Sequence, residues 1–212
     1  MGIAGGLVRL GVGPAGDALD DYGAFDTFTD VINTSLDAHT PERCVSGWVE
    51  HNGDWKITPG PLGSNGAGLN AAVSYGVATL DSGLADGRLR VWVTELMTNK
   101  TVNRGPRLRH KTATKEGWFV IAKAGGLQLQ EHDGASWTTN YTARAGAALP
   151  AGQDDYWVRV VLDGQTITCY ADGVSCSYNA AARCETETRH GIQGSRGANW
   201  SAFFDDFSVR RP

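Results

Sequence analysis

Apolar and polar residues alternate with a period of two along most of this 212-residue chain, as in β-strands that bury one face. In Arg88–Leu96, for example, Leu89, Val91 and Val93 share one face. Glycine-containing turns separate the alternating segments, which is typical of antiparallel hairpins. The pattern recurs in Gly117–Ala124, Leu127–Glu131, Tyr156–Leu162 and Gln165–Tyr170.

Two Asp-Gly pairs divide residues 156–178 into a predicted three-stranded meander. Such pairs favour tight two-residue hairpin turns because both residues tolerate a positive φ. With Asp163-Gly164 as the first turn, Val160 is predicted to lie opposite Ile167.

The second pair, Asp172-Gly173, places Cys169 opposite Cys176 in the predicted hairpin. A disulfide is geometrically possible between these two residues. Both residues lie on a mostly apolar face, however, which favours buried reduced thiols, with the disulfide as the alternative. The four cysteines of the chain lack the spacing of a zinc site.

Many short strands without a long amphipathic helix predict an all-β fold, a two-sheet antiparallel sandwich. One short helical turn is expected near Ala180–Arg183. The 28 glycines agree with many tight turns, and the length suits one large domain.

The first residues of the chain differ from the rest because they are rich in glycine and carry too few large side chains for a core. We therefore divide the chain into an N-terminal arm, residues 1–19, and a β-sandwich, residues 20–212. The arm is either a flexible tail or a segment that orders only against a neighbouring subunit.

The formal net charge of −4 argues against a nucleic-acid partner, since phosphate binding requires a basic face. No segment approaches the roughly 20 apolar residues that span a bilayer, and the first residues lack a signal-peptide pattern. We expect a soluble protein without a membrane partner. A solvated loop is the favoured interpretation of one basic cluster, formed by Arg104, Arg107, Arg109, His110, Lys111 and Lys115.

Paired carboxylates are what a glycan hydrolase requires, with the two groups about 5–10 Å apart. Glu185 with Glu187, and Glu131 with Asp133, have a spacing that suits one strand face. A solvated strand edge explains these pairs more simply, and no Ser-His-Asp order or histidine metal pattern is recognisable. We expect no enzymatic activity, and a glycan hydrolase or lyase that uses these residues is the alternative.

Seven tryptophans offer faces on which sugars stack, while neighbouring polar side chains bind sugar hydroxyls. Trp55, Trp137 and Trp200 lie beside turn-rich segments, where binding residues concentrate. Trp200, together with the adjacent Asn199, is the strongest single candidate for a glycan contact. Packing in the core is the alternative for each tryptophan.

Longer motifs follow one another along the chain: FDTFT…LDAHTPE (25–42), W…NGDWKI (48–57), DGRLRVWV (86–93), PRLRHK…GWFV (106–120), YWVRVVLDGQTITCYADG (156–173) and FFDDFSV (203–209). In this order they resemble concanavalin A-like (LamG-like) lectin and glucanase jelly rolls. The copies that they resemble most occur in virion proteins of tailed bacteriophages. The resemblance covers residues 22 to 211.

The resemblance implies a jelly-roll sandwich whose first and last strands are neighbours. It also implies a non-enzymatic virion structural protein, located on the head or tail, that adheres weakly to host or environmental glycans through many copies. Residues 1–19 would dock on other virion proteins or on sister subunits of a homo-oligomer. A cement subunit without a ligand is the alternative.

In several carbohydrate-binding modules of this kind, a terminal Asp-Asp strand and acidic residues near the N-terminus hold a structural calcium ion. The resemblance therefore suggests Asp205 or Asp206 as calcium ligands, together with Asp26, Asp20 or Asp21. One of two consecutive strand carboxylates must face inward, however, and a hydrogen bond satisfies such a group without metal. We favour the metal-free interpretation and expect no cofactor.

Overall fold

The structure is a computed structural model that describes residues 21–60, 63–70, 73–95, 103–123, 125–137, 141–150, 155–181, 183–197 and 200–212. The predicted arm, residues 1–19, lies outside these ranges. The described strands are β1 (Tyr22–Asp26), β2 (Ser46–Asn52), β3 (Trp55–Pro59), β4 (Asn65–Leu69), β5 (Val73–Asp81), β6 (Gly87–Glu95), β7 (Arg104–Leu108), β8 (Gly117–Lys123), β9 (Gly126–His132), β10 (Tyr141–Ala147), β11 (Tyr156–Asp163), β12 (Thr166–Ala171), β13 (Val174–Asn179), β14 (Arg189–Gly197) and β15 (Trp200–Arg210).

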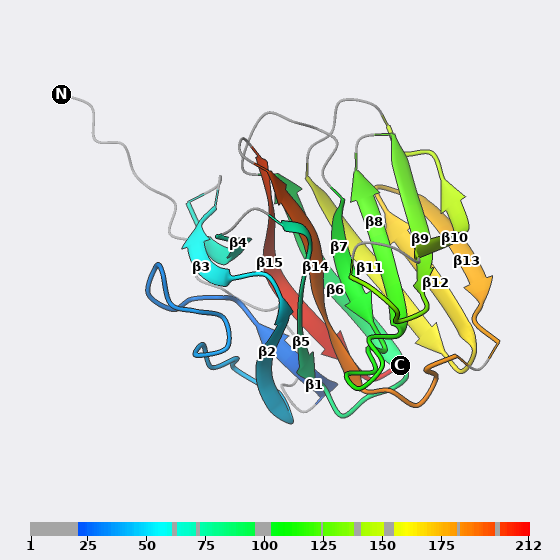
Figure 1. The fold of residues 1–212 in the computed structure, drawn as a ribbon. Coiled ribbons are helices and arrows are strands. Elements are labelled where there is room, and N and C mark those ends of the chain that lie inside the picture. Colours follow the sequence, from blue (N-terminus) through cyan, green and yellow to red (C-terminus); the bar gives the residue numbers. More distant parts are fainter. Residues whose placement is uncertain are drawn as a thin grey trace.

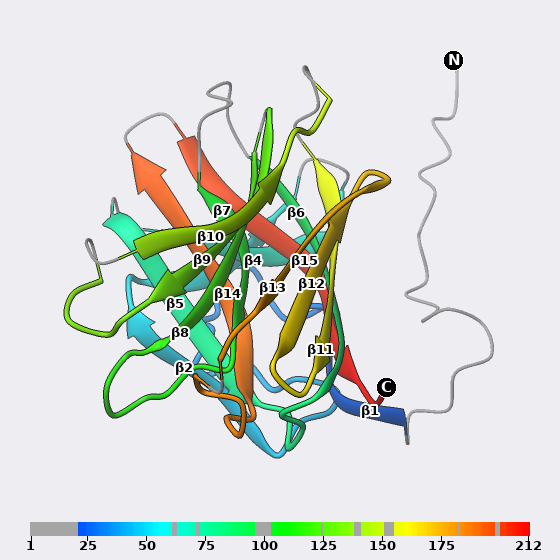
Figure 2. The same cartoon turned by 90° about the vertical axis from the view of Figure 1, so that its right-hand side faces the viewer.

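The strands pair antiparallel and form two facing layers (Figure 1, Figure 2). Sheet A has the order β13-β12-β11-β6-β15, and the other side of β15 pairs with β1 and with β4, which in turn pairs with β3. Sheet B has the order β10-β9-β8-β7-β14-β5-β2. The hairpin from β14 to β15 joins the two sheets, since Arg196 pairs with Ser201. The predicted two-sheet antiparallel sandwich is confirmed.

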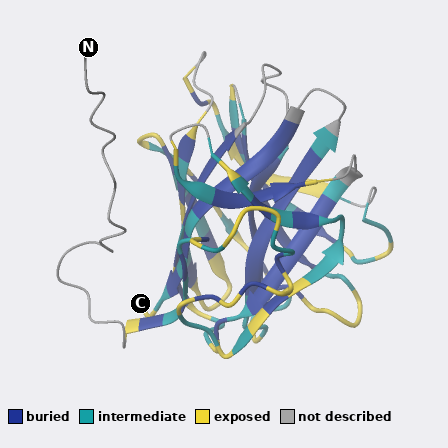
Figure 3. Ribbon diagram, turned by 90° about the vertical axis from the view of Figure 1, so that its left-hand side faces the viewer, coloured by how far each residue is buried: buried dark blue, intermediate teal, exposed yellow. Residues whose placement is uncertain are grey.

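The core lies between the sheets and follows the period-two pattern of the sequence. Leu89, Val91 and Val93 of β6 are buried, as predicted, and belong to one hydrophobic cluster with Val120 of β8 and Ile192 of β14. Figure 3 shows the central strands in the colour of buried residues and many of the exposed residues on the connecting turns. Each such side chain contributes roughly 1.5–3 kcal/mol to folding when it is fully buried.

The two ends of the described chain pair with each other, as the sequence predicts. Phe25 lies opposite Ser208 and Asp26 opposite Phe207, so β1 extends the edge of β15. Behind this pair, the ring of Trp48 meets the edge of Phe207 with ring centroids 5.2 Å apart. The segment after β1 is thereby tied to both sheets, because Trp48 belongs to sheet B and Phe207 to sheet A.

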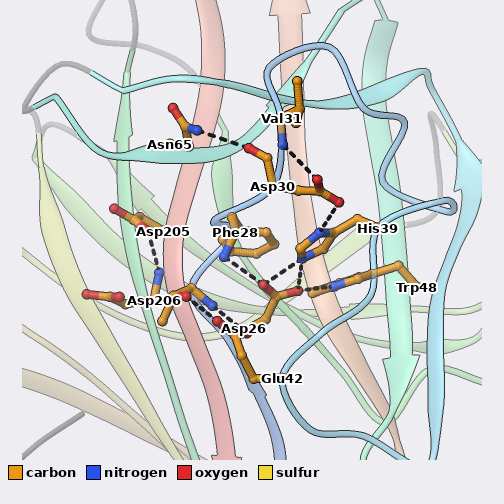
Figure 4. A network of polar contacts seen from close by, with 11 residues as sticks. Asp26, Phe28, Asp30, Val31, His39, Glu42, Trp48, Asn65, Asp205 and Asp206 are labelled. Carbon is orange, nitrogen blue, oxygen red and sulfur yellow. Dashed lines mark hydrogen bonds and ion pairs between the residues drawn. The ribbon is translucent and has the colours of Figure 1, made fainter. Parts of the chain in front are cut away.

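The completely buried carboxylate of Asp26 organises this segment (Figure 4). It accepts hydrogen bonds from the Phe28 backbone N–H at 2.7 Å, from Trp48 Nε1 at 2.5 Å and from His39 Nε2 at 2.9 Å. The other ring nitrogen of His39 lies 3.3 Å from an oxygen of Asp30. Burial lowers the pKa of His39, but the hydrogen bonds and charges of Asp26 and Asp30 outweigh it and raise the pKa above its usual value.

Asp26 and Asp205, two of the aspartates suggested as calcium ligands, do not fit that cation. The oxygens of Asp26 face N–H donors, whereas calcium requires several oxygen ligands around an open centre. Asp205 is buried and accepts a hydrogen bond from Ser64 at 2.7 Å, while Asp206 lies at an irregularity of the β15–β6 pairing. Burial raises the pKa of Asp205 to about 6. The described ranges contain no group of three or more acidic, histidine or cysteine side chains suited to a metal ion.

The structure corrects two local predictions. The first hairpin of the meander turns at Gly164-Gln165, so Val160 lies opposite Cys169 and not opposite Ile167. Moving the turn by one residue changes the cross-strand partner of each residue by two positions. The same face of each strand therefore stays buried. The predicted helical turn near Ala180–Arg183 is replaced by non-helical turns in its described residues. The described ranges contain no helix that is long and apolar enough to cross a membrane.

Cys169 lies opposite Cys176 across the Asp172-Gly173 turn, as predicted. Both turn residues have a positive φ, 46° and 76°, which is the conformation that favours Asp-Gly at this position. Both cysteines are buried free thiols in the structure.

Gly191 of β14 is a position where the packing of sheet B excludes any side chain. An added Cβ would lie 2.0 Å from the backbone oxygen of Ala78. We predict that Gly191→Ala lowers the free energy of unfolding by about 3 kcal/mol or more, because backbone atoms of β5 would have to move. The matched control is Gly47→Ala in β2, where an added Cβ has no neighbour within 4 Å. Urea denaturation of both variants tests this, and equal stabilities would contradict the packing of β14 against β5.

His39 provides a second test of the fold. Its raised pKa means that its contribution to stability is complete below the unfolded pKa near 6.5 and is lost as the pH rises through the folded pKa. We predict that His39→Gln costs more stability at about pH 6 than at about pH 9, by on the order of 1 kcal/mol. A difference between the two proteins that does not change with pH would show that His39 is not a charged partner of Asp26.

Candidate functional site

A cluster of polar and aromatic side chains lies on the face of sheet B that is turned away from the core. Along β14 and β7, core residues such as Ile192 and Leu108 alternate with members of this cluster. The members come from six strands and two loops and are hereafter called the sheet B cluster: His51, Tyr75, Arg107, His110, His132, Trp137, Tyr141 and Gln193.

Arg107 lies at the centre of the sheet B cluster and is completely buried. Its Nη1 donates to Gln193 Oε1 at 3.1 Å, and its Nη2 donates to the Lys115 carbonyl oxygen at 2.5 Å and to His132 Nδ1 at 3.1 Å. All of these partners are neutral. Burial lowers the pKa of the guanidinium to about 10, which leaves it charged at neutral pH.

The interpretation of the basic cluster as a solvated loop is wrong for four of its six residues, whereas Lys111 is exposed and Lys115 half-buried in the loop after β7. Residues 104–108 form β7, all five are buried, and Arg109 and His110 after it are buried as well. Arg109 has a carboxylate partner, Asp86, at 2.7 Å. Arg107 has none among the residues that the structure describes, so its charge is not compensated by an ion pair.

The histidines of the cluster are neutral at physiological pH. Burial, with the charge of Arg107 as a further cause, lowers the pKa of His110 to about 2 and that of His51 to about 4. Burial also lowers the pKa of His132. Each ring nitrogen of His132 lies 2.7 Å from a carbonyl oxygen, Nδ1 from that of Lys115 and Nε2 from that of Ser136, and Nδ1 also lies 3.1 Å from Nη2 of Arg107.

The aromatic members form a continuous row of stacked rings. Trp137 stacks on His132 with an interplanar angle of 10°, and His132 stacks on Tyr141 with centroids 4.4 Å apart. Tyr141 continues the row to Tyr75 at 4.8 Å. Trp137, Tyr141 and Tyr75 are each half-buried, so parts of the row are open to solvent above the buried arginine.

The structure separates the four residues predicted as glycan contacts. Trp137 belongs to the sheet B cluster. Trp55 is completely buried and packs on Phe204, so its candidacy as a contact residue is wrong. Trp200 begins β15, but its side chain and the whole of Asn199 lie outside the described residues.

The carboxylates of the predicted hydrolase alternative lie elsewhere. Glu131 is held by two arginines, with Arg144 at 2.6 Å and Arg183 at 2.6 Å. Glu185 and Glu187 border a separate surface hollow of about 410 Å³ that is also lined by Lys111, Glu116 and Arg183. None of these residues belongs to the sheet B cluster.

Sequence reasoning missed most of the cluster, although one signal was available. In Arg104–Leu108 and the residues that follow it, Arg107 and Arg109 alternate with Leu108, which is a strand pattern and not a loop pattern. The histidines and tyrosines are far apart in the chain, and their juxtaposition depends on the order of the strands in sheet B.

No protein-family model matches the chain, and no curated protein matches it in sequence. Solved structures match its fold at low sequence identity. Carbohydrate-binding module CBM66 from Bacillus subtilis has a TM-score of 0.54 at 15% identity, over 78% of this chain and 96% of that chain. The β-glucanase of Bacillus licheniformis has a TM-score of 0.52 at 12% identity, over 89% of this chain and 97% of that chain.

The fold is a concanavalin A-like jelly roll. A third similar structure, reported with endo-acting O-glycanases of the human gut microbiota, has a TM-score of 0.51 at 10% identity and covers 90% of both chains. The identities are low, so the similarity establishes the architecture of this jelly roll and not its activity.

The neutral histidines make the stability of the jelly roll sensitive to acid. Their pKa values lie below 6.5 in the folded state, so the unfolded chain takes up protons that the folded chain does not, and stability falls as the pH drops below 6.5. We predict that His110→Gln reduces the dependence of the unfolding free energy on pH by about 1.4 kcal/mol per pH unit, because unfolding then takes up one proton fewer. Urea unfolding at a series of pH values measures it, and an unchanged slope would show that His110 is not buried in the neutral form.

Proposed function

We propose that this jelly roll binds glycans through the sheet B cluster without cleaving them. The observation that carries the proposal is the row of stacked rings that ends at Trp137, in which Trp137, Tyr141 and Tyr75 are half-buried and His132 is fully buried. Sugar rings stack their C–H faces on such aromatic surfaces, and adjacent polar groups bind their hydroxyls. The hydroxyl of Tyr141 is such a polar group. Gln193 fixes its position by donating a hydrogen bond to it at 2.8 Å.

The similar structures support this proposal at the level of the fold. One of them is a carbohydrate-binding module, and others are a β-glucanase and a structure reported with O-glycanases. The architecture therefore carries both binding and cleavage of glycans in other proteins, so the residues of the site have to decide between the two.

The composition of the cluster argues against hydrolysis. Glycoside hydrolysis requires two carboxyl groups on either side of the bond, and the cluster contains none. Glu131, the buried carboxylate nearest in sequence to the cluster's His132, is neutralised by Arg144 and Arg183.

Eliminative cleavage is the second candidate function, favoured by one observation. Arg107, Gln193 and Tyr141 form a single hydrogen-bonded network, and elimination next to a sugar carboxylate needs a group that neutralises the acid and another that moves a proton. Burial raises the pKa of Tyr141 to about 12, which makes its hydroxyl a poor base at neutral pH. Arg107 is also completely covered in this structure. We therefore favour binding alone.

The biological setting that we propose rests on the sequence resemblance. In that setting the protein is a bacteriophage virion component, residues 1–19 contact other virion proteins or sister subunits, and many copies strengthen a weak adhesion to glycans. A cement subunit without a ligand is the alternative, and it differs from our proposal in binding no glycan. Purification of the protein as part of a particle would test the virion location independently of glycan binding.

Removal of Trp137 tests the proposed site. We predict that Trp137→Ala weakens binding to any glycan that the protein retains on an array by about tenfold or more, since one stacking surface is lost. The matched control is Trp157→Ala, which truncates a half-exposed tryptophan on sheet A that lies under Arg90. Isothermal titration calorimetry measures both variants, with circular dichroism as the check of folding.

Three results would contradict the proposal. Binding of no glycan would favour the cement subunit, and a loss of binding in Trp157→Ala but not in Trp137→Ala would place the site on the other sheet. Glycan cleavage would establish an enzyme. Absorbance of the unsaturated sugar ends that elimination creates would identify the second candidate, and its dependence on Tyr141 would be tested with Tyr141→Phe.

A further inference from the structure

The geometry points to a more specific ligand: the sheet B cluster selects anionic sugars, which carry a carboxylate or a sulfate ester, over neutral ones. This inference rests on the proposed glycan-binding function and adds the class of sugar. Its basis is the buried positive charge of Arg107.

Arg107 is an arginine whose burial is not balanced within the described chain. Its side chain is completely buried, its hydrogen-bond acceptors are an amide oxygen, a backbone oxygen and imidazole nitrogens, and its Nε has no hydrogen-bond partner. Buried charges in proteins are almost always paired with an opposite charge, because removing a cation from water is costly. The neighbouring Arg109 follows this rule through Asp86.

The groups around Arg107 do not cancel its charge. His110 and His132 are neutral, and the Nε2 of His110 is a second buried nitrogen without a hydrogen-bond partner. Asp133, on the turn after β9, is the acidic residue that acts on His132, and Arg107 influences the pKa of His132 more strongly than Asp133 does. The local potential is therefore positive.

This charge lies beneath the surface on which a sugar would stack. Trp137 and Tyr141 stack on either side of the His132 ring that Arg107 contacts. The Lys115 ammonium adds a second positive charge, 5.6 Å from the centre of the Trp137 ring. These side chains cover Arg107, so it acts on a ligand through its electrostatic field and not through direct contact. The protein interior has a lower dielectric constant than water and therefore screens this field less.

A ligand that complements this surface has a ring face for stacking and a negative charge close to it. Uronic and sialic acids have both features through their carboxylates, and sulfated sugars have them through sulfate esters. Neutral hexoses have only the ring face. The chemistry shared by the first two groups is the anionic sugar, and separate ligands distinguish its two sources.

The test compares oligouronates with the same oligosaccharides after their carboxyl groups have been reduced to alcohols, so that size and linkage are constant. Sulfated oligosaccharides form the third arm. We expect the full-length protein to bind the anionic forms at least about tenfold more tightly at low ionic strength, with the preference falling as salt is added. Affinities are measured by calorimetry.

Two variants assign this preference to the cluster. Lys115→Gln removes a surface charge without disturbing the core and is expected to lower the preference severalfold. Arg107→Gln removes the buried charge and is expected to abolish most of the preference; thermal melting shows whether this variant folds, and Lys115→Gln carries the test if it does not. The control is Lys56→Gln in β3 of sheet A, where the side chain lies 3.8 Å from a carboxylate oxygen of Asp54.

The outcomes separate this inference from the function on which it rests. Equal binding of the uronates and their reduced forms would overturn the inference and leave glycan binding intact. Equal losses in Lys115→Gln and Lys56→Gln would overturn the assignment of the preference to the cluster. Binding of none of the three ligand classes, nor of any glycan on the array, would overturn the proposed function itself.

Discussion

The buried carboxylate of Asp26 is the constraint on which the closed jelly roll depends. A carboxylate with no access to water must accept hydrogen bonds, and its donors come from Phe28, His39 and Trp48. These donors fix the path of the chain from the edge of sheet A to the first strand of sheet B. Pairing of β1 with β15 then joins the beginning of the described chain to its end.

The position of the candidate site follows from this closure. β15 is an inner strand of sheet A, and its hairpin with β14 continues into the middle of sheet B, where Gln193 and Arg107 lie on neighbouring strands. Strands on both sides bring the tyrosines and histidines to the same face. Burying the charge of Arg107 destabilises the fold, and the aliphatic and aromatic core between the sheets offsets this destabilisation.

The sequence predicted the framework better than the site. Period-two alternation and Asp-Gly turns are local signals, so the sandwich and the position of Cys169 opposite Cys176 were predicted correctly, while the turn at Gly164 was misplaced by one residue. The β1–β15 pair joins distant segments, and it was predicted from the family resemblance. The site depends on contacts between strands that are far apart in the chain. Trp55 was chosen for its turn-rich neighbours, but it lies in the hydrophobic core against Phe204. The basic cluster was assigned to solvent because charges are usually exposed, and Arg107 is an exception to that rule.

The most direct test of the account is the position at which a glycan binds. In a nitrogen-15 labelled protein, each of the seven tryptophans gives its own indole N–H signal in a proton–nitrogen correlation spectrum. Titration with a glycan that the protein retains on an array should shift the Trp137 signal and leave that of Trp157 on sheet A unchanged. Shifts at Trp157 without a shift at Trp137 would contradict the assignment of the site to the sheet B cluster.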